Sequence, residues 1–138
     1  MVERRWITFT VGGYRFAVPI ETVREVLNVA SIVPVPGSRL PFEGILPYRE
    51  NMVLPVFSLL DILGKRHDED GSLVVVAGSV EDPIAFKVHS MGGVVVSSET
   101  DETGPYEGDL PSGDWNSGVL KKTGGELILL EVGRLFDS

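Results

Sequence analysis

Residues 6–18 read WITFTVGGYRFAV and have the pattern of a β-hairpin. Apolar side chains alternate with others on both sides of Gly12-Gly13, so each run presents one apolar face, as half-buried strands do. A two-residue Gly-Gly connection suits the primed turns that join antiparallel strands. The stretch therefore predicts that this part of the chain forms two paired strands.

Runs of the same type recur along the rest of the chain, which holds 16 glycines and 9 prolines. A second hairpin is expected from Phe42–Tyr48 and Met52–Phe57 around Glu50-Asn51, and Pro47 and Pro55 inside it indicate edge positions or bulges. Further strands are expected at Leu73–Ala77, Ile84–Val88, Val94–Ser97, Gly118–Leu120 and Leu127–Val132.

Helices are expected to be few and short. Apolar residues recur at intervals of three and four over Glu21–Val29, which predicts an amphipathic helix there. Ser58 is in position to cap one or two helical turns over Leu59–Leu63, and a last short helix is expected at Gly133–Phe136. A bulge or tight bend is expected at Gly92-Gly93.

Short strands separated by turn signals, with few helices, are typical of all-β barrels and sandwiches. The polar segment Lys65–Gly71 (KRHDEDG) is the best boundary, and it separates two halves of similar pattern, residues 1–64 and 72–138. The sequence therefore predicts two small barrels packed together. An exchange of strands between them near the termini stays open.

Composition and charge exclude several classes of function. The chain has 138 residues, no cysteine and a formal net charge of −8, so disulfides and thiolate metal ligands are excluded. Residues 1–64 carry 6 basic and 6 acidic side chains, whereas residues 65–138 carry 6 and 14. An acidic chain without a basic cluster is a poor ligand for nucleic acid. Its apolar runs are too short for a membrane span, and we expect a soluble cytoplasmic protein.

Nothing in the sequence is arranged for catalysis or for metal binding. The histidines, His67 and His89, share no ligand spacing with a carboxylate, and no serine stands beside a histidine in a nucleophile motif. Glu21 and Glu25 would lie one turn apart on the expected helix, which is far commoner on a solvated face than in acid–base catalysis. We therefore expect a binding module with no cofactor and no metal.

Residues 6–29, WITFTVGGYRFAVPIETVREVLNV, and the following Ile32–Pro36 resemble the opening of the CheW family of chemotaxis coupling proteins. The likeness is strongest over residues 44–64, GILPYRENMVLPVFSLLDILG, where the family reads approximately G-V-I-N-L-R-G, an apolar pair, P-V-x-D-L and L-G. Weaker matches follow at Ile84–Met91 and Gly118–Val132. The resemblance implies two packed five-stranded, SH3-like β-barrels. It also implies a non-enzymatic adaptor that bridges the cytoplasmic tip of a chemoreceptor to the regulatory domain of a CheA-type histidine kinase.

The resemblance further implies which residues bind partners. Those on the receptor side are Val23, Glu25, Arg49, Ile84 and Val88, and Gly44 matches a glycine near the kinase-facing region. In the family, the arginine at the Arg49 position lies close to the glutamate at the Glu25 position, and a guanidinium can fork onto both carboxylate oxygens. The alternative is structural: the pair pins one element to another, Gly44 allows a bulge or close backbone approach, and Ile84 and Val88 are core, as we expect for Phe86 between them.

Three positions depart from the family pattern. Glu50 stands where the family has glycine, and Ser58 and His89 stand where it has aspartate. Glu50 is strained if the backbone there has a positive φ. These departures predict a divergent member. They leave open a second function, a module of a pilus-motility or other signalling pathway that binds one protein partner without bridging.

Overall fold

The first hairpin forms as predicted in the computed structural model, which describes residues 3–29, 31–66, 73–78 and 82–135. β1 (Arg4–Val11) pairs antiparallel with β2 (Tyr14–Pro19). Gly12 and Gly13 between them have φ of 56° and 86°, and a type I′ turn requires such left-handed values at both central residues. The glycine pair therefore fixes the register of the hairpin.

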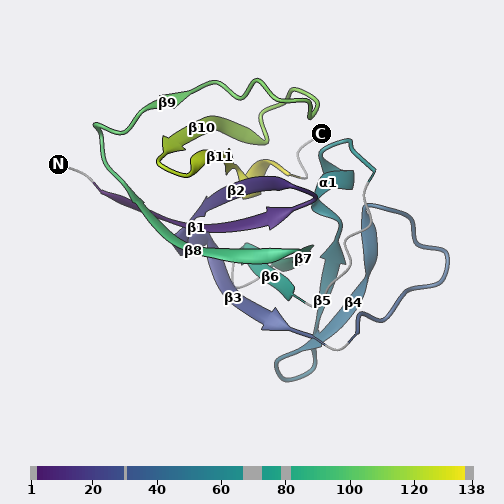
Figure 1. Cartoon of the computed structure of the whole chain (residues 1–138). Helices are drawn as coiled ribbons and strands as arrows, with labels where there is room; N and C mark the ends of the chain where they lie inside the picture. Colours follow the sequence, from purple (N-terminus) through teal and green to yellow (C-terminus); the bar gives the residue numbers. More distant parts are fainter. Residues whose placement is uncertain (1–2, 30, 67–72, 79–81, 136–138) are drawn as a thin grey trace.

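Within the described residues, the strands form a six-stranded and a five-stranded sheet, so the all-β prediction is confirmed (Figure 1). The order β8-β1-β2-β11-β10-β9 adds to the first hairpin β8 (Ser90–Ser97), β9 (Thr103–Gly104), β10 (Asn116–Lys122) and β11 (Gly125–Leu130). The order β3-β6-β7-β5-β4 consists of β3 (Val23–Asn28), β4 (Phe42–Tyr48), β5 (Met52–Phe57), β6 (Leu73–Gly78) and β7 (Pro83–Val88). The helical segments of the described part are α1 (Leu59–Ile62) and two 3-10 turns, η1 (Ile20–Thr22) and η2 (Val132–Arg134).

Each sheet takes strands from both halves of the chain. β1 and β2 pair with β8 and β11, whereas β6 and β7 pair with β3 and β5. The chain leaves the six-stranded sheet after β2 and returns to it after β7, and the β2–β11 and β5–β7 pairs are parallel. Residues 1–64 and 72–138 are therefore interleaved, and the first hairpin completes the sheet of the last strands.

Three groups of buried side chains fill the fold. The five-stranded sheet encloses Leu46, Leu54, Val56, Val74, Val76 and Ala85 on one face. The six-stranded sheet buries Trp6, Ala17, Leu120, Leu127 and Leu129 on one face. The largest group, which we call the shared core, takes side chains from both sheets and from α1. Its centre is a set of aromatic rings at centroid distances of 5.7 Å, Phe9 on Phe16 and Phe9 on Phe86, so Phe86 is a core residue as expected.

The helix predicted over Glu21–Val29 is wrong. η1 ends after one turn, and β3 follows with strict alternation of half-buried and exposed residues. β3 pairs antiparallel with β6, with a bulge between Val23 and Glu25. A spacing of three and four residues fits a helix, but β-branched valines prefer the pleated surface, and the edge of β6 supplies partners for the backbone of this segment.

Smaller features follow the sequence closely. The register of β1 with β8 shifts where Gly93 and Met91 face consecutive residues of β1, which leaves Gly92 unpaired and confirms the bulge. The expected terminal helix is present as η2, while Phe136 lies outside the described residues, as His67 does. No helix within the described ranges is long and apolar enough to cross a bilayer.

Candidate functional site

A cluster of Glu25, Tyr48 and Arg49 joins the two edge strands of the five-stranded sheet. Glu25 lies on β3, Tyr48 ends β4, and Arg49 begins the turn after it. The Tyr48 hydroxyl donates to Glu25 Oε2 at 2.5 Å, and Arg49 Nη2 donates to the same oxygen at 3.0 Å. Because β3 and β4 are the outermost strands of the sheet, these contacts show that the sheet curls until its edges meet. The enclosed apolar core lies beneath the cluster, and the Tyr48 ring packs against it.

Each member of the cluster changes the electrostatics of the others. The Tyr48 hydroxyl, and after it the Arg49 guanidinium, holds the pKa of the Glu25 carboxyl below its ordinary value. The same hydrogen bond raises the pKa of Tyr48, because the phenolate would face a carboxylate. Arg49 also lies over the Tyr48 ring, with its Cζ 5.2 Å from the ring centroid. The carboxylate is thus held charged while the side chain of Arg49 stays 68% exposed.

The expected proximity of Arg49 to Glu25 is confirmed, but the expected fork is not what forms. One nitrogen of the guanidinium contacts one carboxylate oxygen, and Tyr48 takes the same oxygen. Sequence reasoning missed Tyr48, although it stands where the family pattern has leucine. A signal was present in the sequence. A tyrosine at an apolar position buries its ring, so its hydroxyl needs a hydrogen-bond partner, which a half-buried glutamate can be.

Exposed apolar side chains gather at the edge strands beside the shared core. β3 and β8 are outermost in their sheets, and Val26 pairs with Val75 while Val94 pairs with Ile7. Val75 belongs to the shared core and Ile7 packs against it, so Val26 and Val94 extend the same faces beyond the buried region. We call the exposed apolar residues of β3, of β8 and of the turn η1 before β3 the edge surface; it consists of Ile20, Val26, Val94 and Val96, between 37% and 56% exposed.

A second exposed apolar group covers the β4–β5 hairpin. It alternates with the enclosed residues Leu46 and Leu54 and so lies on the opposite face of the two strands. We call it the hairpin surface; it consists of Val33, Ile45, Pro47, Val53 and Pro55. Val53 is 55% exposed and Val33 is 48% exposed. Exposed apolar side chains that gather on one face make that face a candidate contact site.

Gly44 holds one part of the hairpin surface in place. It is buried, its φ is +153°, and the register of β4 with β5 shifts beside it. A Cβ there would lie 2.8 Å from Ile32 Cγ2 and would collide with the Val33 carbonyl oxygen. That oxygen accepts the Ile45 amide at 2.8 Å, and the Val33 amide donates back to Ile45 at 2.9 Å. The expected close backbone approach at Gly44 is therefore confirmed.

The other predicted site residues lie in the shared core or next to a cleft. Val23 is half-buried and packs against the shared core. Ile84 lines a cleft of about 440 Å³ with Glu21, Asp82 and Val132. Val88 is fully buried in the shared core and has no surface to offer to a partner. The structure therefore brings Glu25 and Arg49 together, and it places Val23, Ile84 and Val88 around the core between the sheets.

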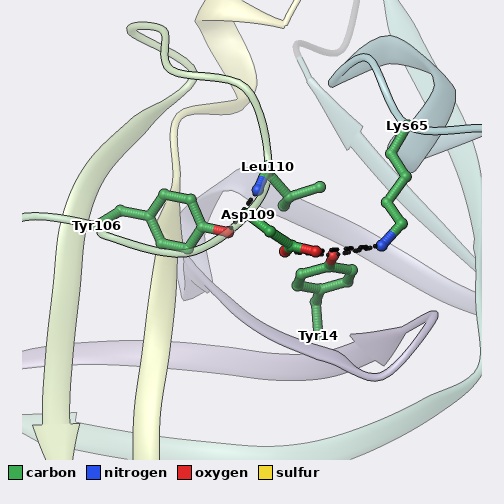
Figure 2. Close-up of polar contacts among 5 residues, drawn as sticks. All are labelled: Tyr14, Lys65, Tyr106, Asp109 and Leu110. Carbon is green, nitrogen blue, oxygen red and sulfur yellow. Dashed lines mark hydrogen bonds and ion pairs between the residues drawn. The ribbon is translucent and has the colours of Figure 1, made fainter.

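The acidic segment 99–114 is fixed to its own chain. Asp109 accepts a hydrogen bond from the Tyr14 hydroxyl at 2.6 Å and pairs with Lys65 Nζ at 3.4 Å, while Lys65 donates to Tyr14 at 2.8 Å (Figure 2). These bonds, that of Tyr14 first, lower the pKa of the Asp109 carboxyl. Three more ion pairs bind Asp101, Glu102 and Asp114 to Lys122, Lys121 and Arg134. Much of the negative charge of the segment is thus neutralised within the chain.

The positions that depart from the family pattern have visible consequences. Glu50 and Asn51 have φ of 26° and 68°, so the turn carries two non-glycine residues in the left-handed region. Ser58 precedes α1, but its hydroxyl donates to Asp61 Oδ2 at 2.5 Å and caps no amide of the helix. His89 is exposed, and its amide donates to the Thr10 carbonyl. Among the described residues, no group of three or more His, Cys, Asp or Glu side chains is placed to hold a metal ion.

Comparisons with known proteins agree on one family. The family model for the CheW-like domain matches residues 5–138. The "Chemotaxis protein CheW" of Thermotoga maritima is 25% identical over 134 residues, which cover 95% of this chain and 86% of that protein. The crystal structure of the scaffolding protein TtCheW from Thermoanaerobacter tengcongensis superposes with a TM-score of 0.81 at 21% identity, over 99% of this chain and 94% of that one.

Proposed function

This chain belongs to the family of CheW-like domains, and on that premise we propose that it is a non-enzymatic adaptor of chemotaxis. In this proposal it couples the cytoplasmic tips of chemoreceptors to the regulatory domain of a CheA-type histidine kinase by protein–protein contacts. It works in the cytoplasm, where it is recruited to membrane-bound receptor arrays. Catalysis, cofactors and nucleic acid have no part in it.

The observation that carries the proposal is the distribution of exposed apolar side chains. An adaptor needs two separate contact surfaces, and the large exposed apolar residues of the described part fall into two groups. Ile20, Val26, Val94 and Val96 form the edge surface, and Val33 and Val53 belong to the hairpin surface, with Leu40 and Met52 in the same segment of the chain. The enclosed core of the five-stranded sheet and the shared core lie between the groups.

We assign the receptor to the edge surface. A receptor tip is helical, and an amphipathic helix binds by laying its apolar side on an elongated apolar surface. The edge surface continues the space between the two sheets, and Glu25 lies beside Val26 on β3 with its side chain on the opposite face of the strand. Val23 and Ile84 support this surface from the shared core and from the adjoining cleft. The buried Val88 contributes only through packing.

We assign the kinase to the hairpin surface, which Gly44 keeps in shape by allowing Val33 to lie against Ile45. Two prolines in this surface, Pro47 and Pro55, add the apolar atoms of their rings to the face that Val53 and Ile45 form. A regulatory domain with an apolar patch of its own fits such a face.

The experiment uses one charge insertion on each surface. Val94 and Val53 are matched controls for each other, because they are 56% and 55% exposed and their replacement leaves the cores intact. Val94→Glu should lose the receptor tip and keep the kinase domain, and Val53→Glu should do the reverse. Binding of each partner is measured by titration calorimetry, and a ternary complex by size-exclusion chromatography. Competition between receptor and kinase for one site, or wild-type binding to neither, refutes the adaptor.

A module that binds one partner without bridging is the second candidate, and Glu50 favours it. Glu50 adds a charge and a left-handed φ of 26° in the turn that follows Arg49, where the family pattern has glycine. If the chain binds a single partner, one of the two charge insertions weakens that binding and the other has no effect on it. The same pair of variants therefore distinguishes a bridge from a single-partner module, in chemotaxis or in pilus motility.

A further inference from the structure

We infer that Tyr48 is a positioning residue, which holds Glu25 and thereby sets the Arg49 guanidinium to receive an acidic side chain of the protein that binds the edge surface. The inference deepens the proposed function and rests on it for the identity of that partner. It starts from a hydroxyl on an otherwise apolar position: the Tyr48 ring packs on the enclosed core, while its oxygen lies 2.5 Å from Glu25 Oε2.

The geometry makes Arg49 depend on Tyr48 in two ways. Tyr48 fixes the carboxylate oxygen to which Arg49 Nη2 is bonded at 3.0 Å, and its ring lies under the guanidinium, with Cζ 5.2 Å from the ring centroid. A flexible arginine loses less freedom on binding when its orientation is set beforehand. Leucine, the family residue at this position, offers neither the hydroxyl nor the aromatic face.

The donors that remain on Arg49 determine the chemistry of the partner. A guanidinium has five N–H donors, and the contact with Glu25 uses Nη2. The side chain is 68% exposed, and within the described part of the chain the guanidinium contacts Glu25 and Tyr48, its neighbours in the cluster. A planar group with paired donors matches the two oxygens of a carboxylate, which is the anionic group of protein side chains. The negative charge of Glu25 repels an approaching acid, so the partner's carboxylate must approach from the exposed side of Arg49.

The position of the cluster relates this contact to both surfaces. Glu25 lies on the same strand as Val26 of the edge surface, and Tyr48 lies on the same strand as Pro47 of the hairpin surface, each with its side chain on the opposite face from that neighbour. The hydroxyl bond therefore joins the strand that carries one surface to the hairpin that carries the other. Removing it leaves the exposed ion pair of Arg49 with Glu25 to hold the edges of the five-stranded sheet together at this end.

The test compares Tyr48→Phe with Tyr14→Phe. Tyr14 is a matched control, because its hydroxyl also donates to a carboxylate, that of Asp109 at 2.6 Å, away from the cluster. Carbon-13 NMR titration of the full chain should find the pKa of Glu25 raised toward its ordinary value in Tyr48→Phe only. The probe for binding is the cytoplasmic helical tip of a chemoreceptor from the source organism. Its affinity should fall roughly fivefold in Tyr48→Phe and stay unchanged in Tyr14→Phe.

A double-mutant cycle separates positioning from a general effect on the fold. If Tyr48 acts through Arg49, then Tyr48→Phe combined with Arg49→Ala binds the receptor tip no more weakly than Arg49→Ala alone. Affinity should also lose most of its salt dependence in Arg49→Ala, because a cation–carboxylate contact is removed. An unchanged pKa of Glu25, or additive losses in the cycle, overturns the inference.

Failure of the proposed function is recognised separately. If the wild-type chain binds neither the receptor tip nor the kinase domain, both the adaptor function and the contact of Arg49 with a partner carboxylate are refuted. If Arg49→Ala weakens receptor binding while Tyr48→Phe raises the pKa of Glu25 without any loss of affinity, the adaptor stands and the positioning role is refuted.

Discussion

Replacing Gly44 by alanine should cost stability in a way that its backbone angle alone does not explain. The new Cβ would lie 2.8 Å from Ile32 Cγ2 and would meet the Val33 carbonyl oxygen at closer range, so Val33 must move away from β4. Both backbone hydrogen bonds between Val33 and Ile45, of 2.8 and 2.9 Å, are then lost. At about 1 kcal/mol for each bond and about 1 kcal/mol for alanine at φ +153°, the free energy of unfolding falls by about 3 kcal/mol.

The assay is urea denaturation followed by far-ultraviolet circular dichroism, with Gly13→Ala as the matched control. Gly13 also has a left-handed φ, +86°, but a Cβ there meets nothing within 4 Å, so its replacement should cost only about 1 kcal/mol. The difference of about 2 kcal/mol isolates the collision with Val33, and it corresponds to a melting temperature lower by roughly 8 °C. Equal losses in the two variants would refute the reasoning, because the close approach of Val33 would then have no energetic weight.

Three further predictions follow from single contacts. Glu50→Gly should raise the free energy of unfolding by about 0.5 kcal/mol in urea titration, because it relieves a left-handed φ of 26°; a loss of stability would mean that the glutamate side chain makes a contact worth more than the strain. The bonds of Asp109 to Tyr14 and Lys65 should be present above the ordinary pKa of an aspartate. They should be lost as the pH falls through the lowered pKa of Asp109, because protonation removes the negative charge that favours both bonds. The protection of amides 106–110 against hydrogen exchange, relative to their intrinsic exchange rates, should fall in that acid range, and constant protection there would contradict these bonds. Lys87→Met should destabilise the chain by about 3 kcal/mol, because Lys87 pairs at 3.3 Å with Glu43 while both are less than 20% exposed, and Lys87→Met with Glu43→Leu should recover most of that loss in thermal melts.

The local pattern of the sequence was a reliable guide wherever turn chemistry marked the ends of an element. Gly12-Gly13, the Glu50-Asn51 turn and the Gly92-Gly93 bulge all lie where their residues predict, and β4 and β5 have the predicted bounds. These features depend on neighbouring residues, whose backbone preferences are visible in the sequence itself. The family resemblance added the proximity of Arg49 to Glu25, which composition and periodicity do not reveal.

Segment 21–29 marks the limit of such reasoning. Its apolar spacing fits a helix, yet Val23–Asn28 pairs with β6, a strand some 50 residues further along the chain. Only the neighbouring strand decides between the two states, because it supplies hydrogen bonds that the isolated segment lacks. The same limit hid the hydroxyl of Tyr48 as a partner of Glu25, since their contact spans 23 positions and depends on how far the sheet curls.

By itself, then, the sequence determined an all-β chain of short strands, the places of its turns, the absence of thiol chemistry and the family to which the strands belong. Only the tertiary structure decided which strands share a sheet, which valines are buried and which form the edge and hairpin surfaces, and which oxygen Arg49 holds. Turns and alternation arise from interactions between near neighbours along the chain, whereas sheet partners and exposed faces are set by the competition of distant strands for one core. Val94 and Val95 illustrate the difference: the sequence treats them alike, and the pairing with β1 turns one toward the six-stranded sheet's own core and leaves the other at the edge surface.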